Sequence, residues 1–318
     1  MTRYALGKAI EMVAAMVAVS FVVFLILEAN VDGVAVKVLG QFSTPDQRQL
    51  WLRENGYFDP FFLRYLRWLW HFATGQWGES THYREAILNL LPERLAATGL
   101  LALCTLAVMV PLSLILGVLA GVREGSPIDR VVTLFSVVTI SVPEFASAVF
   151  LSALFVFSLG WLPGASTMTS GFSWRELVLP VMVLALYSTG YLARITRASM
   201  AEVMASPYIR TALMKGASPA RIVFRHALRN ALIAPVTVIM LQVPWLLSGV
   251  IVVEVFFAYK GFGTLLYEAS LNSDVYVIED CAMVSVVVVV STQLASDLIY
   301  AWLNPRIEFG RKAGAGTR

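Results

Sequence analysis

Hydrophobic positions in this chain form long runs separated by polar loops, rather than the short amphipathic periods of a water-soluble domain. A run of about 20 apolar residues can cross a hydrocarbon core of about 30 Å, and tilt or a polar extension adjusts the fit. Six runs meet this requirement and are predicted to be transmembrane helices: 9–27, 97–120, 131–159, 177–192, 232–257 and 275–302.

The segment between the first two runs, residues 30–96, has a different character, with seven basic residues, seven acidic residues and many aromatics. Within it, DPFFLRYLRWLWHF (59–72) predicts a helix with Asp59 as N-cap and Pro60 at the first helical position. Arginines interleave with the aromatics, which excludes a membrane span. A helix lying at the membrane interface and a small packed subdomain both remain open.

Charge orients the predicted helices, because short basic loops stay in the cytoplasm. The connection 193–230 holds seven basic residues against Glu202 alone, whereas 160–176 and 257–277 hold one basic residue each. We therefore expect both termini in the cytoplasm. The predicted parts are a first transmembrane helix (1–29), an extracytoplasmic segment (30–96), a five-helix membrane core (97–303) with a cytoplasmic loop (201–230), and a cytoplasmic tail (304–318).

Composition agrees with this all-α membrane class, since 58% of the 318 residues are hydrophobic and only 14% are charged. Soluble domains carry about a quarter charged residues. The two cysteines, Cys104 and Cys281, lie inside apolar runs and imply neither a disulfide framework nor a thiolate metal site. No basic patch interleaved with aromatics suggests a nucleic acid partner.

The most distinctive loop is PYIRTALMKGASPARIVFRHALRNALIAP, residues 207–235. It is strongly basic and contains no acidic residue. Gly216 and Pro219 are predicted to divide it into two short helices, because glycine tolerates a turn and proline favours the first position of a helix. Such a loop suits docking to another cytoplasmic protein. Enforcing topology and binding anionic lipid are the alternatives.

Catalytic and cofactor motifs are missing from the sequence. The Gly-rich tail lacks the spacing of a P-loop, and the segment 261–263 lacks the third glycine of a dinucleotide site. His71 and His82 are eleven residues apart with no cysteine nearby, which is not a ligand spacing for zinc. We expect no enzyme activity, no metal and no cofactor in this chain.

Ionisable residues within membrane spans are functional candidates by default. Three fall inside the predicted spans: Glu144, Glu254 and Asp297. Glu144 is mid-span, whereas Glu254 and Asp297 lie near the ends of their spans. One midplane carboxylate gives little support to an ion relay, so a structural pairing with a helix terminus or an arginine is favoured for Glu254 and Asp297.

Taken in order along the chain, several segments resemble the permease subunits of ABC importers of the dipeptide, oligopeptide and nickel type. The resemblance covers nearly the whole chain. The docking loop ends in a His-x-Leu-Arg-Asn-Ala segment starting at His226, and Arg210 occupies the position where ABC importers generally have glutamate. The other similar segments are GQWGES (75–80), RLAATGLLAL (94–103), SVPEFASAVFL (141–151), LGWLP (159–163), LARITRASM (192–200), VIVVEVFFAYKGFGTLL (250–266) and DLIYAWLNPRI (297–307).

This resemblance implies a type I ABC importer permease fold in a bacterial cytoplasmic (inner) membrane. It also implies a second homologous permease, two ATPase subunits that carry ATP and Mg²⁺, and a substrate-binding protein outside. Coupling to the ATPase would involve Tyr208, Ile209, Arg210, Thr211, Ala212, Lys215, Gly216, Ala217, Arg221, His226 and Arg229. Docking of the binding protein would involve Gly75, Trp77, Gly78 and Ser80, although a stabilising cap is an alternative role for the outer segment.

The expected function is import of di- or oligopeptides, with one half of the pathway formed by this chain. The same type of permease could import a nickel chelate, an opine or an oligosaccharide. An ion-coupled secondary carrier is the alternative from another class. It would work without ATPase partners and would contain broken helices in inverted repeats, which the sequence does not display.

Overall fold

The computed structural model describes residues 2–28, 31–169, 171–248 and 250–303, and these are mostly helical. They contain no β-strand, only an isolated bridge between Glu79 and Ala86. Two helical stretches, η1 and η2, are π-helices. The elements are α1 (Thr2–Glu28), α2 (Val31–Leu39), α3 (Pro45–Glu54), α4 (Phe61–Ala73), α5 (Ile87–Val122), α6 (Pro127–Ser141), α7 (Glu144–Ser152), η1 (Ala153–Ser158), α8 (Trp174–Met204), α9 (Pro207–Met214), α10 (Pro219–Arg221), η2 (Ile222–Ala227), α11 (Leu228–Ala231), α12 (Ile233–Ser248), α13 (Ile251–Phe256), α14 (Phe262–Leu271) and α15 (Val275–Leu303).

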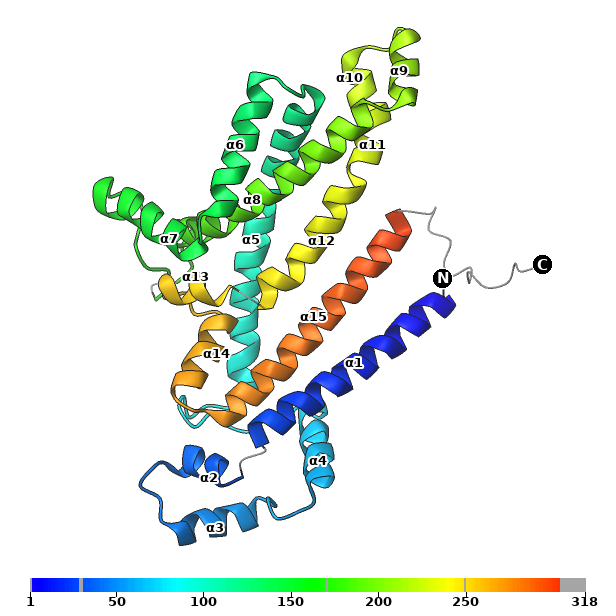
Figure 1. The fold of residues 1–318 in the computed structure, drawn as a ribbon. Helices are drawn as coiled ribbons and strands as arrows, with labels where there is room; N and C mark the ends of the chain where they lie inside the picture. Colours follow the sequence, from blue (N-terminus) through cyan, green and yellow to red (C-terminus); the bar gives the residue numbers. More distant parts are fainter. Residues whose placement is uncertain (1, 29–30, 170, 249, 304–318) are drawn as a thin grey trace, which may run out of the picture.

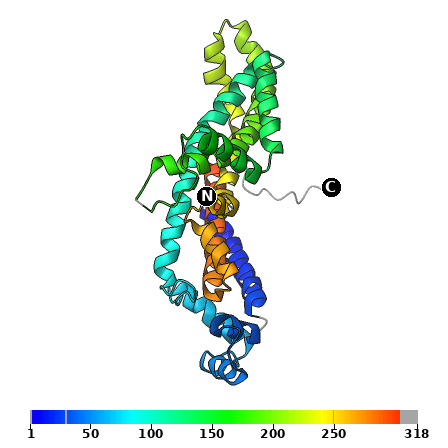
Figure 2. The ribbon, with the colours of Figure 1, turned by 90° about the vertical axis from the view of Figure 1, so that its left-hand side faces the viewer.

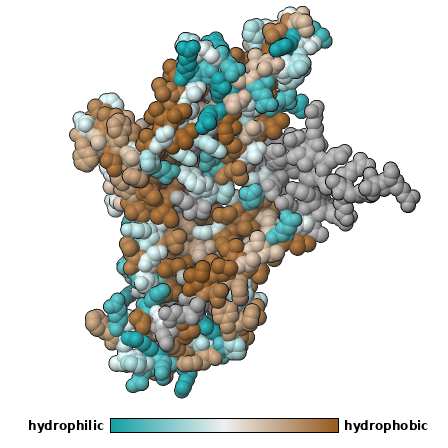
Figure 3. Space-filling model, in the orientation of Figure 1, coloured by the Kyte–Doolittle hydropathy of each residue, from teal (hydrophilic) through white to brown (hydrophobic). Residues whose placement is uncertain are grey.

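The long helices run between two ends of an elongated molecule (Figure 1). The short helices α2, α3 and α4 lie at one end, and α9 and α10 lie at the opposite end in both ribbon views (Figure 2). Hydrophobic residues cover most of the visible surface between the ends, and polar residues are more frequent at the ends (Figure 3). An apolar middle with polar ends is the surface that a bilayer requires.

Three helices are long and apolar enough to cross a membrane: Ile87–Val122, Trp174–Met204 and Val275–Ser296. Two bent pairs raise this number to as many as five among the described residues if each pair is a single span. The apolar segment Ile10–Ile26 within α1 is shorter. The chain is therefore a multi-pass helical membrane protein.

The predicted span over 131–159 is not one straight helix. The helices Pro127–Ser141 and Glu144–Ser158 meet at an angle of 103°, so that α7 projects sideways from the bundle (Figure 1). The bend falls at Val142, whose backbone is extended at φ −90° and ψ 122°. The following Pro143 explains this conformation, because a residue before proline is excluded from the α region by a steric clash.

Other predicted boundaries also need correction. The helix α5 begins at Ile87 inside the predicted outer segment, and α8 continues past Arg194 and Arg197 to Met204. The predicted span 232–257 is two helices, because α12 ends at Ser248 and α13 is separate. The predicted bounds follow the ends of the apolar runs. The helices continue beyond these ends because their terminal turns include polar residues.

In the outer segment, the predicted cap of α4 is also wrong. Pro60 occupies the N-cap position and makes no side-chain cap hydrogen bond. The carboxylate of Asp59 instead accepts a hydrogen bond from Arg67 Nη2 at 2.6 Å. Tyr65 on the same helix is buried, and its hydroxyl is 2.8 Å from Ser20 Oγ on α1. The α4 helix therefore packs on α1, as the subdomain alternative requires.

The most extensive helix contact joins α5 to α8. A Cβ atom placed on Gly117 would lie 2.4 Å from Cβ of Thr196 and 2.7 Å from the carbonyl oxygen of Ala193. Only a residue without a side chain permits this backbone approach, and small residues serve the same purpose in other membrane helix pairs. This contact fixes α8, the helix that leads directly into the basic loop.

A partly buried ion pair holds the end of this helix pair. The guanidinium of Arg197 on α8 donates to both carboxylate oxygens of Asp129 on α6, at 2.8 Å from Nε and 2.7 Å from Nη2. The backbone N–H of Gly125 donates to the same carboxylate at 2.8 Å. Such a two-bond pair fixes direction as well as distance. It sets the position of α8 two turns before the basic loop begins.

Gly117→Ala is expected to destabilise the folded chain in detergent, because overpacking of a tight contact costs about 1–3 kcal/mol. Gly99→Ala on the same helix is the matched control, since nothing lies within 4 Å of a Cβ at that position. The measurement is the thermal unfolding temperature followed by tryptophan fluorescence. Equal unfolding temperatures for the two variants would contradict the packing role of Gly117.

Candidate functional site

Residues 207–231 form a basic helix–turn–helix at the end of the molecule opposite α2–α4 (Figure 1). The first helix, α9, has Pro207 at its start, and Gly216 follows it with φ +76°. A residue with a Cβ in this left-handed conformation costs about 1–2 kcal/mol. Ser218 then caps the next helix by accepting a hydrogen bond from the Arg221 N–H. The predicted break at Gly216 and Pro219 is confirmed as a feature of the backbone.

One side of this unit is buried. Ile209 of α9 packs against Met200 of α8 and Ile222, and all three are at most 1% exposed. Burying a side chain of this size contributes about 1.5–3 kcal/mol. Ala212 and Ala217 pack around the same cluster. These three candidates, Ile209, Ala212 and Ala217, therefore seat the unit on the bundle, and Ile209 cannot contact another protein as the sequence interpretation assumed.

The opposite side is exposed and carries the charges. Arg210, Lys215, Arg221 and Arg229 are exposed, as are Tyr208 and Thr211. His226 is partly buried. Three large apolar side chains lie on the same unit and are also exposed, at 54% for Leu213, 81% for Met214 and 74% for Phe224. A basic surface with large apolar side chains is suited to docking on a protein.

Hydrogen bonds tie the two halves of the unit to each other and to α8. Asn230 Nδ2 donates to the Tyr208 hydroxyl at 2.9 Å, which joins α11 to the start of α9. Ser199 Oγ of α8 donates to the carbonyl oxygen of Ala231 at 2.8 Å. The second half continues into α12 with a bend of 50°. A force on the unit is therefore transmitted to α8 at one end and α12 at the other.

Glu254 is fully buried in α13 and hydrogen-bonded. It accepts hydrogen bonds from the Thr98 hydroxyl of α5 and, at 2.9 Å, from the Thr264 N–H in the first turn of α14. The Phe262 N–H donates to Thr98 Oγ1 at 2.8 Å. A carboxylate is favourable at a helix N-terminus. This is the geometry of a structural pairing with a helix terminus, and it joins three helices.

The other two ionisable candidates do not join Glu254. Glu144 is the first residue of α7, directly after the bend and not in the middle of a straight span. At this position the helix dipole stabilises its carboxylate. Asp297 lies on α15, but its side chain is outside the described part of the structure, as is the whole predicted tail 304–318. The described residues contain no group of three metal-ligating side chains.

The outer candidates lie on the loop between α4 and α5. Trp77 stacks on Phe72 at 5.4 Å between ring centroids, and Gly75 and Gly78 have positive φ angles. Ser80 is 2% exposed and its hydroxyl donates to Asp274 at 2.5 Å. Ser80 thus anchors the loop to the start of α15 and does not form its surface, contrary to the sequence interpretation. Gly78, Glu79 and Thr81 are exposed around it.

Another anchor of this loop is Tyr83, whose hydroxyl donates to Glu268 of α14. Burial and this hydrogen bond raise the pKa of Tyr83 above its ordinary range, so the phenol stays protonated and continues to donate. The outer loop is therefore tied to α14 through Tyr83 and to α15 through Ser80.

A cavity of about 300 Å³ lies between α8 and α12. Its lining carries no charged group, and Gln242 supplies the only side-chain amide. The cavity residues themselves form no sequence motif, and only the packing of two helices brings them together. The lining residues are Tyr187, Tyr191, Val238, Leu241, Gln242 and Trp245.

Sequence reasoning missed these cavity residues, the Asp129–Arg197 pair and the exposed apolar group of Leu213, Met214 and Phe224. The last group had a detectable signal, because large apolar residues interrupt a strongly basic loop outside any membrane run. The partners of the ion pair are 68 residues apart and had no such signal.

Comparison with known proteins places this architecture in a family. The model of the binding-protein-dependent transport system inner membrane component matches residues 113–309. The di/tripeptide transport system permease protein DppB of Pseudomonas aeruginosa is 34% identical over 82% of this chain and 84% of its own length. The oligopeptide transport system permease protein AppB of Bacillus subtilis is 30% identical over 97% of this chain and its own full length.

A solved structure shares the fold. A chain from the methionine ABC transporter MetNI, crystallised in inward-facing conformations, aligns with 68% of this chain and 95% of its own length. The TM-score is 0.53 and the sequence identity 19%. With the exposed basic helix–turn–helix, the apolar bundle and the match over residues 113–309, this chain belongs to the family of binding-protein-dependent transport system inner membrane components.

Proposed function

We propose that this chain is the permease subunit of an ATP-driven importer of di- or oligopeptides, forming half of the pathway beside a second, homologous permease. The observation that carries the proposal is the rigid basic helix–turn–helix at one end of a membrane bundle of this family. Relatives named as oligopeptide and di/tripeptide permeases support the substrate class. The chain itself needs no cofactor, since ATP and Mg²⁺ belong to two partner ATPase subunits.

The proposed topology has six spans, with α1 as the first and the bent pairs counted as one span each. The basic unit 207–231 and both termini lie in the cytoplasm, and residues 30–86 lie outside. The distribution of arginine and lysine supports this orientation. The position of α2–α4 at the end opposite α9 is consistent with it (Figure 1).

In the proposed mechanism, each ATPase subunit holds one helix–turn–helix. The exposed Met214 and Phe224 fill an apolar cleft, and Arg210 and Arg221 contact acidic residues around it. Because Ile209 and the Ser199–Ala231 hydrogen bond join the unit to the bundle, closure of the ATPases moves α8 and α12 together. This movement changes which side of the membrane the pathway faces.

The cavity between α8 and α12 is the proposed contact with the passing peptide. Its aromatic and amide lining lacks charge, so it would accept peptide backbones without selecting acidic or basic side chains. Both helices also carry the motion of the coupling unit. Substrate contact and energy input thus meet on the same two helices.

The outer loop 75–83 is the proposed docking surface for a substrate-binding protein. Its anchors, Ser80 and Tyr83, hold the exposed Gly78, Glu79 and Thr81 at the outer end of α15 and α14. A nickel chelate, an opine or an oligosaccharide is the alternative cargo. An ion-coupled carrier is disfavoured by the hydrogen-bonded, structural setting of Glu254.

Charge reversal at the coupling unit, Arg210→Glu with Arg221→Glu, is expected to reduce ATP-driven peptide uptake in proteoliposomes by about tenfold or more, which corresponds to about 1.4 kcal/mol. Phe224→Asp should have the same effect, because it places a charge in an apolar contact. The folded permease should remain in the membrane. Arg53→Glu, an exposed reversal on the outer side, is the control. Wild-type uptake by the coupling variants would refute the assignment.

Trp245→Ala is expected to raise the KM for peptide uptake, because the indole forms part of the uncharged wall between α8 and α12. Trp174→Ala is the matched control, since Trp174 is 65% exposed and lies outside this cavity. Uptake kinetics of a radiolabelled dipeptide measure both variants. An unchanged KM in Trp245→Ala would remove the cavity from the pathway.

Glu79→Arg combined with Thr81→Arg is expected to weaken binding of the loaded substrate-binding protein to the complete transporter, because both side chains are exposed on the anchored loop. Surface plasmon resonance on transporter in nanodiscs gives this affinity. Ser80→Ala serves as a comparison that should lower the unfolding temperature through loss of the Asp274 hydrogen bond. Unchanged docking by the double variant would favour a purely stabilising cap.

A further inference from the structure

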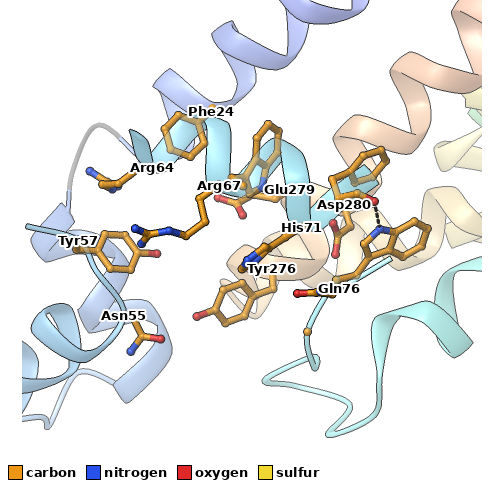
Figure 4. A pocket seen from close by; sticks show the side chains of 14 residues that line it. Phe24, Asn55, Tyr57, Arg64, Arg67, His71, Gln76, Tyr276, Glu279 and Asp280 are labelled. Atoms are coloured by element: carbon orange, nitrogen blue, oxygen red, sulfur yellow. Dashed lines mark hydrogen bonds between the residues drawn. The ribbon is translucent and has the colours of Figure 1, made fainter. Parts of the chain in front are cut away.

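A second cavity, of about 320 Å³, lies at the outer end of the molecule, away from the proposed pathway. Four parts of the chain form it: the end of α1, the turn after α3, the helix α4 with the loop after it, and the first turns of α15 (Figure 4). Cavities of about 300 Å³ and more are the size that small ligands occupy.

Helical spacing explains why its polar groups converge. On α15, Tyr276, Glu279 and Asp280 are separated by three and four residues and share one helix face. On α4, Arg64, Trp68 and His71 follow the same rule. Figure 4 shows the side chains of Glu279 and Asp280 lining the same pocket as those of Arg67, His71 and Tyr276. Two carboxylic acids and several aromatic rings therefore meet in one space.

The carboxyl groups are buried but incompletely paired. Glu279 is 4% exposed and hydrogen-bonded by Trp68, yet its Oε1 atom has no hydrogen-bond partner. Asp280 is 5% exposed, and among the described residues none donates a hydrogen bond to it. A buried charge is costly unless it is paired. The Glu279 Oε1 atom can therefore accept a hydrogen bond from a donor group bound in the cavity.

The nearby arginines already have partners. Arg67 Nη2 is 2.6 Å from Oδ2 of Asp59, a residue that does not line the cavity. The Arg64 guanidinium lies over the Tyr57 ring at 4.6 Å from its centroid, and its charge attracts the Glu279 carboxylate without a hydrogen bond to Oε1. The donor that Glu279 lacks is therefore best supplied by a ligand.

We propose that this outer cavity is a second ligand site, which binds the protonated primary amine of a small molecule of the amino acid or short peptide class. The ammonium group donates to Glu279 Oε1 and lies close to the Asp280 carboxylate. The rings of Trp68, Tyr57 and Tyr276 line the space around its hydrocarbon part. Aromatic faces also attract the positive charge of the ammonium group. His71, on the same lining, can donate to the carboxylate end of such a ligand. The site is separate from the proposed pathway and stands without it.

The test is isothermal titration calorimetry on the assembled permease pair in nanodiscs, without binding protein or nucleotide. The probes are alanyl-alanine, its N-acetylated form, which lacks the ammonium group, and ethanolamine, which lacks the carboxylate. We expect alanyl-alanine to bind, N-acetylation to abolish binding, and ethanolamine to bind at least about tenfold more weakly.

Glu279→Gln should weaken alanyl-alanine binding by about tenfold or more, because it removes the charge and keeps the shape. Glu54→Gln, an exposed carboxylate outside the cavity, is the matched control. Asp280→Asn provides a second variant if the first does not fold, and the unfolding temperature monitors both. Trp245→Ala in the other cavity should leave this binding unchanged, so failure here is distinguishable from failure of the proposed pathway.

Equal binding of the free and acetylated dipeptides would overturn the proposal, as would full affinity in both Glu279→Gln and Asp280→Asn. Equal affinity for ethanolamine would overturn the amino acid and peptide class in favour of a lone amine, such as a lipid headgroup.

Discussion

The close contact of α8 with α5 is the constraint on which the rest of this permease depends. Two backbones approach at Gly117 and Thr196 with no room for another carbon atom, and the Asp129–Arg197 pair fixes the next residue of the same helix. Because α8 is held along its length, the unit attached to its end is a lever and not a loose loop. The other end of the unit, α11, is also attached, because the Ala231 carbonyl accepts a hydrogen bond from Ser199 of α8 and the chain continues directly into α12.

Polar groups within this apolar bundle serve mainly to join helices. Glu254 illustrates this, because its carboxylate accepts hydrogen bonds both from the Thr264 N–H at the start of α14 and from the Thr98 hydroxyl of α5. In a bilayer, backbone N–H groups at a helix start have no water to bond with, so a buried acceptor is needed. The same physical reason explains Asp274, whose carboxylate accepts from Ser80 and from the His82 N–H and thereby attaches the outer loop.

The two ends of the molecule use their exposed groups differently. At the α9 end, Met214 and Phe224 lie among arginines on an exposed surface. On the buried side of the same unit, Ile209 packs against the bundle. At the α4 end, the aromatic residues pack on α1 and leave a cavity above buried carboxylic acids. We therefore propose that the α9 end contacts a large partner and that the α4 end holds a small ligand.

The sequence by itself determined the apolar runs, the break at Gly216 and Pro219, and the family, because local turn chemistry, run length and ordered motifs are all contained in neighbouring residues. The bend at Val142 was also within reach, since Pro143 restricts it, but its 103° angle depends on packing. Only the tertiary structure decided which side of residues 207–231 is buried, the pairing of Asp129 with Arg197, and both cavities. These features depend on helices that meet from distant parts of the chain, and no local pattern encodes such meetings.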